Sequence, residues 1–346
     1  MTDLLTRQEN STGRLTLNRP DALNALTHDM ALSMETQLNL WKDDHGISQV
    51  LIDAVGERAF CAGGDIQDLY DHGKKGDFAF GQRFWRDEYR LNALIARYPK
   101  PVVVMMQGFV MGGGVGIACH GSHRVVGLTS RIALPECSIG LIPDVGSSTI
   151  LAAAPGRLGD YLATTGYRMD AGDAIHAGFA DIFIPEEQWP EVTAQLIEEG
   201  RPDIFHHSGM TPPSPSLSEH QEEIRSLFTT ADAAALIRRL ESAEGEFARA
   251  TAAIMRRQSP LSIYGTLAIL RELRTKPGLD HALELEYRFT SRSSARGDFL
   301  EGIRAAIIDK DRNPAWKHAS IEDVPDVDIE EMLAPLDQDL KGYGNE

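Results

Sequence analysis

The stretch KPVVVMMQGFVMGGGVGIA, residues 100–118, decides the fold. Its first part, Val102–Met106, is a strongly apolar run of strand length. This run leads directly into the glycine-rich residues 108–116, and a helix is expected to follow toward Cys119. A buried strand, a glycine turn and a helix in this order predict a βα unit of a largely parallel sheet.

The glycine run Gly112–Gly116 allows two interpretations. It is not a dinucleotide-binding loop, because the last glycine of G-x-G-x-x-G would fall on Ile117 or Cys119. It is either a helix N-terminus that offers open backbone amides to an oxyanion, or a tight turn in which glycine serves only close packing. The run alone leaves both open.

Strand and helix patterns alternate on both sides of this stretch, which predicts an α/β protein. The expected strands are Val50–Val55, Val102–Met106, His123–Val126 and Arg131–Leu134, and the expected helices are Thr27–Trp41 and Phe78–Tyr98. The break TPPSPSLSE, residues 211–219, has the composition of a linker or long loop. We expect a core over residues 1–200, a linker or loop over 201–220, and a helical C-terminal region over 221–346.

Composition limits the classes of function. The 346 residues include 34 basic and 51 acidic side chains, a net charge of −17, which argues against nucleic-acid or anionic-membrane binding. No apolar run is long enough for a bilayer, and MTDLLTRQEN lacks the pattern of a secretory or transit peptide, so a cytoplasmic location is expected. Cys61, Cys119 and Cys137 form no C-x-x-C pair and predict no zinc or redox site.

A second glycine turn, Ala62-Gly63-Gly64-Asp65, also frees backbone amides. An oxyanion hole needs two donors that converge on one oxygen, and two glycine turns that follow strands of one sheet can supply them. Asp65 by itself is better explained as a helix N-cap than as a catalyst.

Two carboxylates, Glu136 and Asp144, stand eight positions apart in LPECSIGLIPDVG, residues 134–146. Each follows a proline, and the stretch around them is otherwise apolar or small. A carboxylate in apolar surroundings can work as a base or an acid at neutral pH. The alternative is a pair of capping carboxylates beside a surface turn.

Four blocks in this order resemble the crotonase, or enoyl-CoA hydratase/isomerase, superfamily. They are LNRPDALNALT (17–27), AFCAGGDI (59–66), KPVVVMMQGFVMGGGVGIA (100–118) and LPECSIGLIPDVGSS (134–148). The resemblance implies a crotonase-like spiral of ββα units with a helical C-terminal region. It also implies acyl-CoA binding, with the thioester oxygen received by two backbone amides, and it suggests a homo-oligomer, a trimer or a hexamer.

The resemblance also implies roles for individual residues. It places the two amides at Gly64 and Gly113, and it suggests that the loop with Ala62, Asp65 and Ile66 cradles the adenine end of CoA. No metal or redox cofactor is implied, because CoA arrives as part of the substrate.

The side chains indicate a branch of the superfamily. Hydratases carry a second glutamate where this chain has Gly116, which disfavours a plain hydratase. The single Glu136 with Asp144 resembles the 3-hydroxyisobutyryl-CoA hydrolase branch, and so does FWRDEYRLN (84–92), whose substrate-associated glutamate corresponds to Glu88. The stretches LEYR (285–288) and DFLEGIRA (298–305) also match that branch. The expected reaction is hydrolysis of a β-hydroxyacyl-CoA in valine catabolism.

Three points stay open at this stage. An enoyl-CoA isomerase or hydratase that uses Glu136 as its base, and a non-catalytic acyl-CoA-binding protein, are the rival functions. Ser147 and Ser148 stand where the branch has further glycines, and would narrow the pocket or cap a helix. Asp21 replaces a lysine that relatives place near the CoA phosphates.

Overall fold

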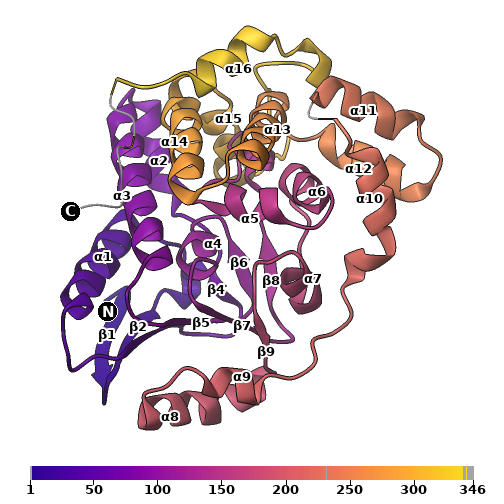
Figure 1. Ribbon diagram of the computed structural model, residues 1–346. Helices are drawn as coiled ribbons and strands as arrows, with labels where there is room; N and C mark the ends of the chain where they lie inside the picture. Colours follow the sequence, from indigo (N-terminus) through magenta and orange to yellow (C-terminus); the bar gives the residue numbers. More distant parts are fainter. Residues whose placement is uncertain (1, 231, 338–339, 341–346) are drawn as a thin grey trace. The chain divides into compact units, whose positions relative to one another are not determined.

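The computed structural model describes residues 2–230, 232–337 and 340 (Figure 1). By their internal contacts these residues form two compact units, and each is built from three separate segments. The first unit comprises the described residues within 1–65, 87–133 and 168–218. The second comprises those within 66–86, 134–167 and 219–346.

The first unit contains a six-stranded sheet of order β1-β2-β3-β5-β7-β9. The pair β1–β2 is antiparallel and every later pair is parallel. The strands are β1 (Leu4–Glu9), β2 (Thr12–Leu17), β3 (Gln49–Ala54), β5 (Val102–Met106), β7 (His123–Val126) and β9 (Ile182–Phe183). This confirms the predicted, largely parallel sheet.

A second, three-stranded parallel sheet of order β4-β6-β8 lies in the same unit. Its strands are β4 (Ala59–Cys61), β6 (Phe109–Met111) and β8 (Arg131–Ala133). In each of the successive pairs β3–β4, β5–β6 and β7–β8, the first strand joins the larger sheet and the second joins the smaller one. This repeated step confirms the ββα spiral, and it brings both glycine turns to the ends of strands of the small sheet.

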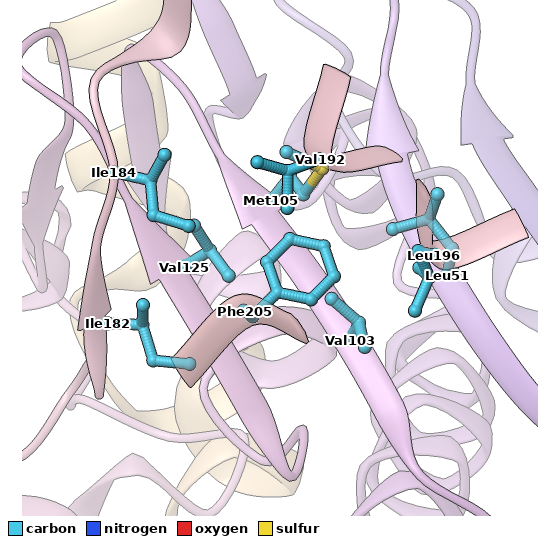
Figure 2. Packing of buried hydrophobic residues seen from close by; sticks show 9 residues of the cluster. All are labelled: Leu51, Val103, Met105, Val125, Ile182, Ile184, Val192, Leu196 and Phe205. Atoms are coloured by element: carbon cyan, nitrogen blue, oxygen red, sulfur yellow. The ribbon is translucent and has the colours of Figure 1, made fainter. Parts of the chain in front are cut away.

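Helices α8 (Trp189–Glu199) and α9 (Ile204–Ser208) cover one face of the larger sheet (Figure 1). Figure 2 shows the ring of Phe205, from α9, among side chains of the central strands. The buried members of this cluster are Leu51, Val103, Met105, Val125, Ile182, Ile184, Val192, Leu196 and Phe205. Strands buried in this way read as continuous apolar runs, which is why Val102–Met106 was recognisable in the sequence.

The remaining helices of the first unit are short, apart from α1. They are η1 (Pro20–Ala22), α1 (His28–Lys42), α4 (Gly113–Ala118), α7 (Ala171–His176) and η3 (Glu186–Gln188). Helix α3 (Phe78–Ala96) begins in the second unit and ends in the first. The predicted helix starting at Thr27 is confirmed, because the Thr27 hydroxyl accepts the Met30 amide at 3.1 Å and caps α1.

The second unit is helical, and its part after residue 220 contains the C-terminal helices that the resemblance implied. Its elements are α2 (Ile66–Lys74), η2 (Glu136–Ile139), α5 (Ser147–Ala153), α6 (Leu158–Thr165), α10 (Gln221–Leu227), α11 (Ala233–Ser242), α12 (Glu246–Met255), α13 (Pro260–Thr275), α14 (Leu279–Arg296), α15 (Phe299–Ile303), η5 (Arg304–Ile308), η6 (Ile321–Asp323) and α16 (Asp326–Leu333). Helices α5, α13 and α14 contact one another, with Phe289 and Ile142 in their shared apolar cluster. The Leu141–Gly146 loop therefore leads directly into a packed helical layer.

The segment TPPSPSLSE is held to the first unit where it meets the 3-10 helix η4 (Ser216–His220). Ser216 Oγ donates to Asp170 Oδ2 at 3.0 Å, and the Leu217 amide donates to Asp173 Oδ1 at 2.9 Å. Residues 211–215 carry no helix or strand.

Candidate active site

Gly64 and Gly113 lie side by side in the first unit. A Cβ atom built on Gly113 would stand 3.3 Å from the Gly64 amide nitrogen and would collide with Oε1 of Glu88. Gly113 is the first residue of α4, so its N–H has no partner inside that helix. The two predicted amides therefore belong to one small region, in which a side chain at position 113 would displace the Glu88 carboxyl and crowd the Gly64 amide.

Gly64 is held by the chain that precedes α1. Gly64 and Leu26 form an isolated parallel bridge, in which the Leu26 amide donates to the Gly63 carbonyl at 2.9 Å and the Asp65 amide donates to the Leu26 carbonyl at 2.8 Å. The Gly64 amide donates neither of these two hydrogen bonds. Leu26 immediately precedes the cap of α1, so a helix start fixes the position of the amide.

Glu88 lies on α3 beside the two glycines, with its side chain 3% exposed. A run of charged residues such as Arg86-Asp87-Glu88 is usually a solvated helix face, but Glu88 is buried. Asp87, by contrast, pairs with His28 at 2.7 Å and with Arg90 at 2.8 Å. The same helix thus carries charged groups toward α1 and a buried carboxyl toward Gly113.

Asn92 follows Glu88 by four residues and shares its helix face. Its side chain is fully buried, and neither Nδ2 nor Oδ1 has a hydrogen-bond partner among the described residues. Buried amides normally find partners in protein or ordered water. Asn92 closes the motif FWRDEYRLN, but the motif alone predicted no role for it.

The remaining predicted CoA contacts flank Gly64. Ala62 donates its amide to the Leu23 carbonyl at 3.1 Å, and the Asp65 carboxylate pairs with Arg19 at 3.0 Å. Ile66 begins α2 and belongs to the second unit. Asp21 is exposed in η1.

Glu136 opens the 3-10 helix η2 in the second unit, and its side chain is 5% exposed. The neighbouring Cys137 thiol donates to the Ala163 carbonyl at 3.4 Å, which ties η2 to α6. The N-cap of η2 is Pro135 and no side chain caps it. Glu136 is thus a buried carboxyl, and the interpretation as a surface capping group is wrong.

Asp144 is also buried in the second unit, at 4% exposure, and it precedes a strained turn. Val145 has a φ of 55°, in the left-handed region that β-branched residues avoid, and Gly146 follows at 77°. Such a residue costs about 1–3 kcal/mol and persists only where its surroundings hold it. The Asp144 carbonyl accepts the Ser147 amide at 2.9 Å and closes the turn into α5.

Glu286, on α14, provides the group that holds this turn. Its fully buried carboxylate accepts the Gly146 amide at 2.7 Å, the Ser148 amide at 3.2 Å and the Ser148 hydroxyl. Burial is the largest cause that raises the pKa of Glu286, and together with the nearby Asp144 charge it brings the pKa to about 8, against the lowering effect of these three donors. Ser148, which stands where the branch has a glycine, therefore donates hydrogen bonds to Glu286 instead of capping its own helix.

Glu286 was not among the residues predicted from the sequence, although a signal was present. The buried positions of α14 include Ala282, Leu283, Glu286, Phe289 and Thr290, which follow helical spacing. A glutamate on such an apolar stripe needs partners in the interior, because an isolated buried charge is costly. Periodicity alone does not name those partners.

Nucleophilic thiols are not available in this protein. Cys61, Cys119 and Cys137 are buried and free, and burial raises the pKa of each to about 12. Among the described residues, no group of three or more His, Cys, Asp or Glu side chains could hold a metal ion. The described helices include none with the length and apolar character needed to cross a membrane.

A groove of about 730 Å³ on the first unit is a separate feature. Gln107, Glu186 and Trp189 are among its lining residues, and none of the predicted site residues lines it.

Comparison with known proteins identifies the family. The model of the family described as enoyl-CoA hydratase/isomerase matches residues 12–333. The chain is 36% identical over 351 residues to the mitochondrial 3-hydroxyisobutyryl-CoA hydrolase of Gallus gallus, covering 98% of this chain and 91% of that protein. It is 38% identical over 341 residues to the protein of the same name from Xenopus tropicalis, covering 95% and 88%.

Solved structures are similar over the same length. A crystal structure of a protein named enoyl-CoA hydratase, from Rhodobacter sphaeroides, has a TM-score of 0.92 at 50% identity and covers 97% of this chain and 98% of that one. One of a protein named carnitinyl-CoA dehydratase, from Mycobacterium thermoresistibile, has a TM-score of 0.94 at 40% identity and covers 99% of both chains. The chain belongs to the enoyl-CoA hydratase/isomerase family, the crotonase family.

Proposed function

We propose that this protein hydrolyses a short β-hydroxyacyl-CoA thioester, 3-hydroxyisobutyryl-CoA, to 3-hydroxyisobutyrate and CoA. The observation that carries the proposal is the combination of two buried carboxyls, Glu136 and Asp144, with a glycine at position 116. A hydratase of this family uses a second glutamate there. The names of the relatives from Gallus gallus and Xenopus tropicalis support the same reaction.

In this proposal the thioester oxygen is received by the amides of Gly64 and Gly113. Preorganised donors stabilise the negative charge that develops on the oxygen, an effect of about 3 kcal/mol for each donor. This role fits the glycine requirement at position 113, because any side chain there would meet Glu88 and the Gly64 amide.

Glu136 supplies the reacting carboxylate by one of two routes. As a nucleophile it forms an acyl anhydride at the thioester carbon, CoA leaves as a thiolate that takes up a proton, and water then cleaves the anhydride. As a base it removes a proton from the water that attacks the thioester. An acyl adduct on Glu136, detected by mass spectrometry after rapid acid quench, distinguishes the first route from the second.

Asp144 is proposed to bind the substrate hydroxyl. A site built to hydrogen-bond a hydroxyl discriminates strongly against an analogue that lacks it, because its buried polar group is then left unpaired. This accounts for a preference for 3-hydroxyisobutyryl-CoA over isobutyryl-CoA.

The second candidate is an enoyl-CoA isomerase or hydratase with Glu136 as its base. It is favoured by the 50% identity to the Rhodobacter sphaeroides protein, which is named an enoyl-CoA hydratase. Isomerisation needs one proton-shuttling carboxylate, and assigns no role to Asp144. A non-catalytic acyl-CoA-binding protein accounts for neither buried carboxyl.

The deciding measurement is thiol release from four thioesters: 3-hydroxyisobutyryl-CoA, 3-hydroxypropionyl-CoA, crotonyl-CoA and a 3-enoyl-CoA. We expect rapid release from the two hydroxyacyl substrates and a loss of at least about 100-fold in kcat with Glu136→Gln. Glu241→Gln, which removes an exposed partner of Arg256, is the matched control and should keep full activity.

Consumption of crotonyl-CoA or the 3-enoyl-CoA without thiol release would establish the hydratase or isomerase function instead. Binding of all four thioesters without turnover would establish the non-catalytic alternative.

A further inference from the structure

We propose that Glu286 is a positioning residue of this site, which holds the Asp144–Ser148 turn so that the Asp144 carboxylate is kept in place for the substrate hydroxyl. The inference rests on the proposed function, since it takes the role of Asp144 from it. Nothing in the sequence motifs assigned Glu286 a part in the chemistry.

The geometry of the contact is specific to the turn. One carboxylate oxygen of Glu286 accepts the Gly146 amide at 2.7 Å, and the other accepts the Ser148 amide at 3.2 Å together with the Ser148 hydroxyl. The two oxygens thus bind residues two and four positions after Asp144. A buried carboxyl group that accepts three hydrogen bonds from one turn restrains both the position and the orientation of that turn.

The turn needs such a restraint. Val145 is held at a φ of 55° and Gly146 at 77°, directly after Asp144. Val145 is fully buried, so the strained residue cannot relax toward solvent. Because the strain lies between Asp144 and the two amides bound by Glu286, loss of the carboxylate should release the segment that orients Asp144.

Simple helix capping does not account for Glu286. The N-terminus of α5 could be satisfied by a neutral serine or asparagine at the N-cap, which here is Gly146. The chain instead carries a fully buried carboxyl from a different helix, close enough to Asp144 for the Asp144 charge to help raise its pKa. The replacement of branch glycines by serine adds the hydroxyl donor at position 148 to the same contact.

The test compares four variants of the full-length protein in the thiol-release assay, each at a temperature where circular dichroism shows it folded. Glu286→Leu should lower kcat/KM for 3-hydroxyisobutyryl-CoA about 100-fold. Glu286→Gln, which keeps one acceptor oxygen, should restore part of that loss, and Ser148→Ala should lower kcat/KM several-fold. The matched control is Asp160→Asn, which weakens another buried carboxylate in the second unit, the partner of Arg274. It should lose stability but keep kcat/KM.

A second measurement tests whether Glu286 acts through Asp144. In an Asp144→Asn background, Glu286→Gln should change kcat/KM less than about twofold, because coupled residues are not additive. If the Asp144→Asn variant shows no turnover, the single and double variants are compared instead by the inhibition constant of the substrate analogue 3-hydroxybutyryl-CoA.

Unchanged kcat/KM in the folded Glu286 variants, or losses that multiply with that of Asp144→Asn, would overturn the inference. If Glu286→Leu does not fold, Glu286→Gln and Ser148→Ala decide the outcome. Failure of the proposed function looks different, since the wild type then releases no CoA from any thioester. The same variants are in that case compared on whichever thioester is consumed, and equal rates there would also overturn the role of Glu286.

Discussion

At the scale of single residues, Gly113 meets two requirements at once. Its amide belongs to the first residue of α4, where we propose that the thioester oxygen binds, and a Cβ atom at this position would meet both Oε1 of Glu88 and the Gly64 amide. A methyl group there would push apart the groups that the reaction needs together. Small displacements in such a site are costly, because donors act only when they are aimed at the developing charge.

We therefore expect Gly113→Ala to lower kcat for 3-hydroxyisobutyryl-CoA by about 100-fold or more, the usual cost of losing one oxyanion donor. Thiol release under saturating substrate measures the effect. The control is Gly46→Ala, since a Cβ at that exposed position meets only side-chain atoms of Asp44 and Gln8. Equal kcat for Gly113→Ala and the wild type would contradict the placement of the oxyanion hole.

Glu286 also makes stability depend on pH in a definite direction. Its folded-state pKa is raised from 4.5 to about 8, so the folded protein holds a proton that the unfolded chain has released over this range. The contribution of Glu286 to the free energy of unfolding is fully present below about pH 4.5, and it is lost progressively as the pH rises from there through about 8. The slope is up to about 1.4 kcal/mol per pH unit for a single group.

Urea unfolding of the wild type and Glu286→Gln between pH 5 and pH 9 isolates this group, because all other carboxyls are common to both. The wild type should lose a few kcal/mol relative to the variant as the pH rises through about 8. A difference between the two proteins that stays constant with pH would contradict the raised pKa.

At the scale of elements, the approach of α13 to α14 depends on Gly265. A Cβ at this position would stand 2.5 Å from Cε2 of the buried Phe289 ring. Helix propensity favours alanine over glycine by about 1 kcal/mol, whereas overpacking a core costs about 1–3 kcal/mol. The overpacking cost should exceed the gain in helix propensity, because the Phe289 ring is enclosed in the apolar cluster and has no space to move into.

Gly265→Ala should therefore lower the free energy of unfolding by about 1–2 kcal/mol, measured from the urea midpoint at constant m-value. The double variant Gly265→Ala/Phe289→Leu serves as the control, since the smaller side chain makes room for the methyl group. It should be more stable than the sum of the two single changes predicts. Stabilisation by Gly265→Ala alone would show that the helices tolerate the extra volume.

At the scale of the whole molecule, charge is the dominant feature. The chain carries 34 basic and 51 acidic side chains, a net charge of −17, while the proposed substrate carries the phosphates of CoA. Long-range repulsion then slows encounter at low ionic strength, and salt screens it over a Debye length of about 8–10 Å.

We expect kcat/KM for 3-hydroxyisobutyryl-CoA to rise a few-fold when NaCl is increased from about 10 to about 150 mM. The N-acetylcysteamine thioester of the same acid lacks the phosphates and is the matched control, with little salt dependence expected. A fall of kcat/KM with salt would mean that local cations outweigh the net charge.

The sequence by itself determined the ββα core, because buried parallel strands leave continuous apolar runs and glycine turns that can be read locally. Val102–Met106 and the turns at Gly64 and Gly113 are of this kind. It also singled out Glu136 and Asp144 as unusual carboxyls in an apolar stretch. These features can be read from the sequence alone, because strand burial and turn geometry depend on residues that are neighbours along the chain.

Only the tertiary structure decided which side chains contact the glycine turns and the turn after Asp144. Glu286 lies 142 positions after Asp144 and meets its turn only because α14 packs against α5 and α13, and Glu88 is buried only because α3 faces Gly113. The two units are each assembled from three separated segments, so their contacts cannot be read from spacing along the chain. Burial and charge coupling belong to the packed interior, and the same glutamate would be an ordinary solvated side chain on an isolated helix.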